Sequence, residues 1–446
     1  MRKRYIFIPL IVIIVIAGVL VWACKHPTGT GIPEIANESS GEDGGGEFMS
    51  PQALMGSGGG IKLGDGYVLP QNSLSQEEQD EEYDPDFNNT ILFSGRNIPA
   101  LTVTSNGVIL ATAGTTSGPI TIKRSSDMGK TWFETTVNGT TSGIGYIHPF
   151  FINCHNGDIL LGVVSNNAGS KTTIIYRGNN DGRNWTVETN INFSDICKDT
   201  KECFVTYGQG ITLRHQKDSS SKKLMFPYWY TNNQTKAWTA PMVSSDDGKT
   251  FNTNDCTFGS KKQNIGDFKS YETKLIELSD GNILLNMRNS FGDGGNTVTW
   301  IKSTDCGKNW QWSAAAYKGW QDVNEDAKHA DLVRYEFSGK DIKDKGSKYA
   351  LAIYSSYTGS GYSVRMTTND FNNGVTGDKY HYNRKFAEES GNEDGYPAIT
   401  VLPDGTIATL TEENSSDIVF RRFNLSWLTY KEEKINYNID LKNNNN

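Results

Sequence analysis

An eight-residue motif, S-x-D-x-G-x-T-W, recurs along this chain of 446 residues and constrains its fold more than any other feature. Ser125–Trp132 matches the motif at every fixed position, and Ser244–Phe251 and Ser303–Trp310 each match it with one substitution. Gly178–Trp185 is a degraded copy, and Thr368–Asp370 resembles the start of another. Self-similarity at intervals of roughly 50 to 70 residues indicates an array of repeated structural units.

Each octapeptide has the composition of a tight turn. An aspartate can accept hydrogen bonds from backbone amides two or three residues further on, and glycine supplies a positive φ. The serine and threonine hydroxyls can satisfy further backbone groups, and the terminal tryptophan can pack beneath the turn. We therefore expect the aspartates of the octapeptides to be structural rather than catalytic.

A second repeat runs in phase with the first. The repeat consists of two turn residues, the second of them glycine, followed by an aliphatic strand. Two further strands are similar but lack the preceding glycine turn. The six segments are Asn106–Leu110, Asn156–Leu160, Lys223–Tyr230, Asp280–Leu284, Lys348–Ser355 and Asp404–Ala408. Short strands, glycine-rich turns and a unit of about 60 residues are typical of four-stranded blades around an axis.

These repeats predict an all-β fold, a six-bladed β-propeller that occupies residues 86–435. No helical periodicity of comparable length competes with the strand pattern. We expect Ile91–Thr104 to share a blade with Ile418–Trp427, because a propeller closes its ring by joining the two ends of the chain in one blade.

The composition excludes several classes of protein. Lys and Arg number 43 against 51 Asp and Glu, and the resulting formal net charge of −8 argues against a nucleic-acid partner. Aromatic residues make up 11% of the chain, too many for a disordered protein. No cysteine or histidine spacing fits a zinc site, so we predict neither a metal nor another cofactor.

The N-terminus has the pattern of an export signal. A basic segment, Met1–Arg4, precedes an apolar run, Tyr5–Ala23, which is followed by Cys24. Leu20–Cys24 resembles a bacterial lipobox, so we predict a signal peptide over residues 1–24, lipidation of Cys24 and attachment to the cell envelope or surface. The alternative is an uncleaved membrane anchor, because the run approaches the length of a membrane span.

Residues 25–85 are rich in Gly, Ser and acidic side chains and predict a flexible tether. The last residues, 436–446, predict a frayed tail. An exported protein can form disulfides, and Cys197 and Cys203 are close enough in sequence to close a small loop.

The octapeptides resemble the Asp boxes (BNR repeats) of the sialidase, or neuraminidase, superfamily, and other segments extend this resemblance. Phe93–Leu101 is similar to the family's first inner strand, which carries a Phe/Tyr-Arg-Ile-Pro motif. Ser270–Asn289 is similar to the stretch that bears the catalytic Glu and the second binding Arg. Gly395–Glu412 is similar to the segment with the nucleophilic Tyr. The resemblance covers roughly residues 90 to 427.

The resemblance implies a retaining exo-sialidase that releases terminal sialic acid from sialylated glycans. Tyr396 would be the nucleophile, because a carboxylate would be repelled by the carboxylate of the sugar, and Glu272 would be its base. Arginines would bind the sugar carboxylate through bidentate hydrogen bonds. The implied substrate-binding residues are Arg96, Arg288, Arg365 and Glu412, of which Glu412 would orient the first arginine.

The chain departs from the family pattern in three places. Arg96 lies one residue early, so either a bulge returns it to the pocket, which Gly95 would ease, or Asn97 takes its place. The segment between Asn97 and Arg124 contains no Asp or Glu, although the family's acid Asp lies there. The usual place of the third arginine is near Ser360, and Arg365 is the nearest candidate.

Three functions therefore remain open. The first is an exo-sialidase with an unidentified general acid. The second is a non-catalytic propeller that binds sialylated or other acidic glycans, which the missing acid favours. The third is another exo-glycosidase on the same fold. We favour the enzyme, because a pure binder has no use for a Glu272/Tyr396 pair.

Overall fold

The computed structural model describes most of the predicted propeller. The described residues are 69–166, 172–179, 181–193, 202–216, 222–232, 236–253, 270–289, 298–310, 329–337, 350–355, 361–367, 382–387, 395–414 and 416–435. All of them belong to one compact unit, Ser50–Asn446. Within these ranges, no helix has the length and apolar character needed to cross a membrane.

The described strands form six sheets, most of them built from consecutive strands of the chain. The first sheet contains β2 (Asn97–Val103), β3 (Ile109–Gly114), β4 (Thr121–Ser125) and β5 (Phe133–Thr136). The second contains β6 (Gly145–Asn153), β7 (Ile159–Asn166), β8 (Thr172–Asn179), β9 (Asn184–Asn192) and the short β11 (Gly208–Gln209). The third contains β10 (Glu202–Val205), β12 (Ile211–Thr212), β13 (Leu224–Asn232) and β14 (Lys236–Ser244). The fourth sheet contains β15 (Ser270–Glu277), β16 (Ile283–Asn289) and β17 (Val298–Ser303). The fifth contains β18 (Ala330–Arg334), β19 (Ala350–Ser355), β20 (Tyr362–Thr367) and β21 (Tyr382–Phe386). The sixth contains β22 (Pro397–Val401), β23 (Ile407–Glu413), β24 (Asp417–Phe423) and β1 (Asn89–Phe93).

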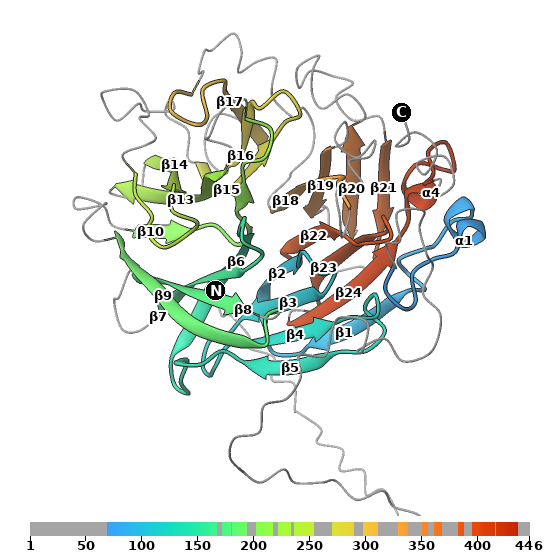
Figure 1. Cartoon of the computed structure of the whole chain (residues 1–446), viewed down its shortest axis with the longest axis horizontal. Coiled ribbons are helices and arrows are strands. Elements are labelled where there is room, and N and C mark those ends of the chain that lie inside the picture. The colour runs from blue at the N-terminus through green and yellow to red at the C-terminus, as the bar shows by residue number, and fades with distance from the viewer. Residues whose placement is uncertain are drawn as a thin grey trace, which may run out of the picture. The chain divides into compact units, whose positions relative to one another are not determined.

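The predicted all-β propeller is confirmed. The sheets are arranged around a central axis, with β2, β6, β15, β18 and β22 innermost (Figure 1). The six repeated strands of the sequence are β3, β7, β13, β16, β19 and β23, and each lies next to the first strand of its sheet. Among the described residues, five sheets have the four or five strands of a complete blade and the β15–β17 sheet has three.

The ring closes differently from our expectation. Only β1 pairs with β24, whereas β2 becomes the inner strand of the next blade, so Ile91–Thr104 is divided between two blades. Gly95 lies between the two strands with a φ of 68°, a conformation that glycine adopts without strain. The sequence pattern did not separate the strands, because both are apolar and only Ser94–Arg96 interrupts them.

The turns of both repeats behave as the sequence predicts. The glycine after each first strand, at positions 107, 157, 281 and 405, has a φ between 80° and 90°. In the first octapeptide, the Asp127 carboxylate accepts hydrogen bonds from the amide and hydroxyl of Thr131, at 2.9 and 2.7 Å. Asp246 and Asp305 accept the corresponding bonds in the other two copies. These aspartates are therefore engaged in holding turns.

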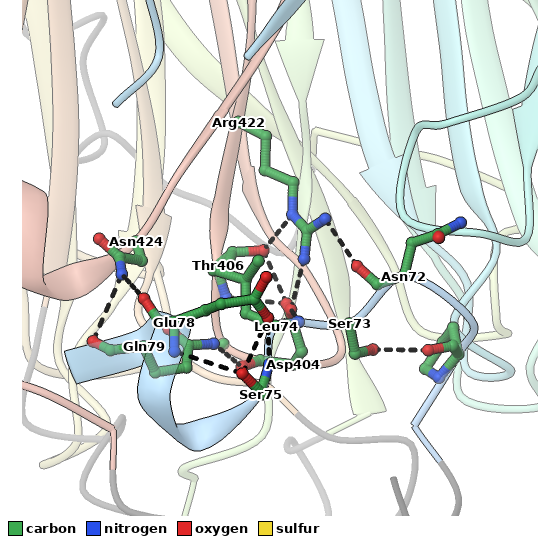
Figure 2. A network of polar contacts seen from close by, with 12 residues as sticks. Asn72, Ser73, Leu74, Ser75, Glu78, Gln79, Asp404, Thr406, Arg422 and Asn424 are labelled. Carbon is green, nitrogen blue, oxygen red and sulfur yellow. Dashed lines mark hydrogen bonds and ion pairs between the residues drawn. The ribbon is translucent and has the colours of Figure 1, made fainter. Parts of the chain in front are cut away.

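One prediction about the tether is wrong, because residues 69–84 are docked on the last blade. Leu69 and Leu74 are buried, and the Leu74 amide donates to the Asp404 carboxylate at 2.9 Å. Arg422 pairs with Asp404 and also donates to the Asn72 carbonyl (Figure 2). The acidic run contributes structure as well, since Ser75 and Glu78 form a capping box at the start of α1 (Gln76–Asp80).

The error has a physical cause. The average composition of this segment is polar, but two leucines and one capping box are enough to dock a short segment on a surface that already offers buried polar partners. The remainder of the predicted tether, residues 25–68, and the predicted tail, 436–446, lie outside the described residues. So does Cys197, although Cys203 is described and buried.

Candidate functional site

Three inner strands carry the same irregularity near their first residues. Ile98 of β2, His148 of β6 and Glu272 of β15 have positive φ values of 53°, 52° and 45°. The register of each strand against its neighbour shifts at that residue, as in a β-bulge. Such backbone costs about 1–3 kcal/mol per residue and concentrates at functional sites. Because every inner strand starts its blade, the three bulges gather at one end of the channel.

Tyr396 and Glu272 meet at this end. Tyr396 directly precedes β22, and its hydroxyl donates a hydrogen bond of 2.6 Å to Glu272 Oε1. The Glu272 residue is 7% exposed, whereas Tyr396 is half-buried. The expected contact between the two residues is therefore present, although 124 positions separate them in the sequence. A phenol that donates to a buried carboxylate can be deprotonated by it as the phenol oxygen attacks an electrophile.

A histidine that the sequence analysis did not select completes this group. His329 directly precedes β18 and is 3% exposed. Its Nδ1 lies 2.8 Å from Glu272 Oε2, and its ring lies 3.7 Å from the Tyr396 ring, measured between centroids. The sequence offered no signal for His329, because the repeated strand of its blade, Lys348–Ser355, lacks the turn glycine that marks the end of the inner strand in four of the other blades.

A buried ion pair lies behind the group. The Lys274 ammonium and the Asp331 carboxylate are 3.4 Å apart, and each side chain is 1% exposed. Lys274 also donates to the Tyr207 carbonyl and lies over the Tyr207 ring, while Asp331 accepts from the Ile399 amide at 3.0 Å. Burial lowers the pKa of Lys274 and raises that of Asp331, since each charged form loses hydration. The pair joins β15, β18 and β22.

Tyr207 packs against Tyr396 from another side. Its ring meets the Tyr396 ring edge-on, with centroids 4.8 Å apart, and its hydroxyl donates to the Ala330 carbonyl at 3.1 Å. His148 lies at the same end, with Nδ1 3.0 Å from the Val205 carbonyl. Burial lowers the pKa of His148, so its neutral form is favoured at neutral pH. Aromatic and imidazole rings therefore form much of the wall around the Tyr396–Glu272 pair.

The bulge that we considered for Arg96 is present. It lies at Ile98, between Arg96 and Pro99, and therefore offsets the extra residue before the Ile98–Pro99 pair. Both terminal nitrogens of the Arg96 guanidinium lie 3.5 Å from the Pro119 carbonyl. Burial lowers the pKa of Arg96, and the charge of Glu134 on β5 offsets part of this effect. Asn97, the alternative, keeps its side-chain oxygen buried.

Glu412, which we expected to orient Arg96, contacts the backbone two residues further along the chain from that arginine. Its Oε2 accepts a hydrogen bond of 3.2 Å from the Ile98 amide, at the tip of the β2 bulge. Burial raises the pKa of Glu412, and hydrogen bonds from the backbone amides of Ile98 and Tyr396 offset only part of this effect. Glu412 thus links the first residues of β2 and β22, the two inner strands on either side of the ring closure.

The raised pKa of Glu412 leads to a pH-dependent prediction. A carboxyl group whose pKa is higher in the folded state contributes most stability when protonated and loses that contribution as the pH rises. Glu412→Gln, which stays neutral, is therefore expected to raise Tm at pH 7.5 but to have little effect at pH 4. Thermal unfolding at both values measures this.

The adjacent residue supplies a matched control. Glu413 pairs with Arg421 at 2.8 Å, so Glu413→Gln is expected to lower Tm at pH 7.5, the opposite sign. A lower Tm for Glu412→Gln at pH 7.5 would contradict the burial argument.

The other predicted site residues are less closely placed. Arg288 lies on β16, opposite Tyr271 of β15, but its side chain is outside the described part of the structure. Arg365 is buried on β20, the third strand of its blade, so it is not on the inner strand where we expected it. That inner strand is β18, which the sequence analysis did not identify. Cys24 lies outside the described residues.

A cavity of about 1070 Å³ opens at the other end of the channel, where first strands turn into second strands. Three of its ionisable side chains contact one another. His215 and Arg334 each lie 3.0 Å from Glu336 Oε1. Burial raises the pKa of Glu336, but these two partners outweigh burial and hold it at about 2. We therefore place the candidate site at the Tyr396 end. Among the described residues, no group of His, Cys, Asp and Glu side chains could hold a metal ion.

Comparisons with known proteins bear on this assignment. No protein-family model matches the chain. A sialidase from Micromonospora viridifaciens is 26% identical over 370 residues, which cover 75% of this chain and 52% of the relative. The chain thus spans about half the length of that relative.

Solved structures show the same fold. The Hadza microbial sialidase Hz136 is 19% identical, with a TM-score of 0.54 over 77% of this chain and 67% of that one. Trypanosoma rangeli sialidase in complex with 2,3-difluorosialic acid, a covalent intermediate, is 19% identical, with a TM-score of 0.52 over 74% of this chain and 54% of that one. At this identity the likeness establishes a sialidase-like propeller.

Proposed function

We propose that this sialidase homologue is an exo-acting glycoside hydrolase that releases terminal sialic acid from glycoconjugates with retention of configuration. Tyr396 attacks the anomeric carbon, its proton passes to Glu272 Oε1, and the glycosidic bond breaks, so that the aglycone leaves with the bonding electrons and takes a proton from a general acid or from water. Water then attacks the anomeric carbon, the Tyr396 oxygen departs and recovers the proton from Glu272, and the proton of the attacking water is released to solvent. The hydrogen bond of 2.6 Å between Tyr396 and Glu272 is the observation that supports this proposal.

The phenol needs a base because a free tyrosine, with a pKa near 10, is mostly neutral at pH 7. Glu272 is held for this task by its backbone, since the bulge turns it out of the regular register of β15. The positive φ of 45° at Glu272 is a conformation that concentrates at functional sites.

A second candidate deserves a test, because the Arg96 guanidinium contacts the Pro119 carbonyl. If that contact keeps Arg96 from the substrate, the site holds a sugar carboxylate less firmly, which favours another exo-glycosidase or a glycan-binding propeller. The described loop Thr115–Gly118, at the same end, contains no carboxylate that could act as the general acid.

The decisive experiment compares two substrates. An aryl sialoside has a leaving group that departs with little protonation, whereas sialyl-lactose requires an acid. Cleavage of both supports a sialidase with an acid from another segment, and cleavage of the aryl sialoside alone supports a sialidase without one. Cleavage of neither overturns the sialidase proposal, and a panel of other aryl glycosides then tests the second candidate.

A covalent trap tests the retaining mechanism separately. If Tyr396 is the nucleophile, 2,3-difluorosialic acid should add one glycosyl unit to the chain, and peptide mass spectrometry should locate it on Tyr396. Labelling elsewhere, or none in a protein that hydrolyses the aryl sialoside, would contradict the assignment.

We also propose that the protein is exported and anchored through lipidated Cys24. The support comes from the sequence of residues 1–24. Mass spectrometry of the mature N-terminus tests this proposal, because a lipidated chain begins at Cys24.

A further inference from the structure

We propose that His329 is a positioning residue that holds Glu272 and Tyr396 as one unit, so that the site operates with a Tyr–Glu–His group rather than a Tyr–Glu pair. This inference rests on the proposed function. It is carried by two contacts of one buried side chain, a hydrogen bond to the base and a ring contact with the nucleophile.

The hydrogen bond fixes which carboxylate oxygen serves as the base. His329 Nδ1 lies 2.8 Å from Glu272 Oε2, and the Tyr396 hydroxyl lies 2.6 Å from Oε1. Glu272 is ionised when it accepts the Tyr396 proton, so His329 must carry its proton on Nδ1 to complete the arrangement. With Oε2 held, the carboxylate cannot rotate Oε1 away from Tyr396. Partners of this kind commonly contribute 10- to 100-fold to the activity of the residues they orient, by analogy with metal ligands.

The ring contact fixes the nucleophile. The His329 and Tyr396 rings lie 3.7 Å apart at an angle of 34°, and Tyr207 closes another side of the Tyr396 ring edge-on. His329 also precedes β18, whose Ala330 carbonyl accepts the Tyr207 hydroxyl and whose Asp331 belongs to the buried ion pair. The imidazole is therefore anchored by its own backbone and has little freedom to leave the group.

The proton transfer balances without any change at His329. As Tyr396 Oη bonds to the anomeric carbon, its proton moves to Glu272 Oε1, the glycosidic bond breaks, and Nδ1–H remains on His329. The aglycone leaves with the bonding electrons and takes its proton from a general acid or from water. Three other titratable groups that act on Glu272 are His148 of β6, Lys274 on the same strand and Tyr396 itself. Substituting His329 leaves these three unchanged.

Two substitutions separate the hydrogen bond from the ring contact. His329→Asn keeps a donor at nearly the position of Nδ1 and removes the ring, whereas His329→Phe keeps a ring and removes the donor. We expect His329→Phe to lower kcat for the aryl sialoside by about 100-fold and His329→Asn to lower it by less than about 10-fold. His155→Asn, at the other end of the channel, serves as the matched control and should retain wild-type kcat.

The pH profile of kcat/KM supplies a readout that packing alone would not change. A donor to the Glu272 carboxylate favours its ionised form, so removing the donor makes protonation easier. The acidic limb of the profile should therefore move to higher pH in His329→Phe and stay near the wild-type position in His329→Asn. Equal kcat losses in both variants with an unchanged limb would overturn the proposal.

Nitrogen NMR of the histidine side chains gives a second readout that needs no turnover. The chain has 6 histidines, so the His329 signal can be identified by comparison with His329→Asn. We expect protonation on Nδ1 in the wild type and a changed signal in Glu272→Gln. The Nε2–H tautomer, or a signal insensitive to Glu272→Gln, would overturn the inference. An inactive wild type with the Nδ1–H signal would instead overturn only the proposed function.

Discussion

Tyr396→Phe is expected to abolish hydrolysis of an aryl sialoside, with a fall in kcat of at least about 10⁴-fold, the scale seen when a nucleophile is removed from a covalent catalyst. The substitution removes only the hydroxyl that donates to Glu272, and the ring can keep its contacts with His329 and Tyr207. No covalent intermediate can then form. Steady-state kinetics on folded protein, with thermal unfolding as a check, measures the effect.

Tyr207→Phe is the matched control for this experiment. Its ring lies against Tyr396, but its hydroxyl donates to the Ala330 carbonyl and not to Glu272. We expect it to lose about 1 kcal/mol of stability, typical of one hydrogen bond, and to keep kcat within about tenfold of the wild type. If Tyr396→Phe retained more activity than Tyr207→Phe, Tyr396 would not be the nucleophile.

Lys274→Met is expected to lower the free energy of unfolding by about 3–5 kcal/mol, the usual consequence of removing one partner of a buried ion pair. Asp331 would then be left in the interior with the Ile399 amide but without its cation. Because the pair joins β15, β18 and β22, the loss falls on three inner strands at once. Chemical denaturation measures the change.

Two variants define the origin of this loss. Lys431→Met removes an ion pair with Glu81 on the surface, where both side chains are well exposed, and should change stability little. The double variant Lys274→Met/Asp331→Leu should recover part of the loss, because no buried charge then remains. If the double variant were less stable than Lys274→Met, the cost would come from packing and not from the unpaired charge.

The sequence alone determined the architecture. Octapeptides such as Ser125–Trp132 repeat because each must make the same turn, and the glycine turns at Gly107 and Gly405 mark where inner strands reverse. These are local constraints, since hydrogen bonds to Asp127 span four residues and a positive φ belongs to one. Local constraints leave a pattern in the sequence, so the propeller and its second strands could be predicted before any coordinates.

The candidate site depended on both the sequence and the tertiary structure. Glu272 and Tyr396 could be selected by resemblance, but only the tertiary structure brought them to 2.6 Å and added His329 and the Lys274–Asp331 pair. It also placed the bulge at Ile98, because the position of a bulge cannot be read from strand alternation. The docking of Leu74 on Asp404 was missed for a related reason. Contacts between segments that are far apart in the chain leave no periodic trace, so only the folded chain decides them.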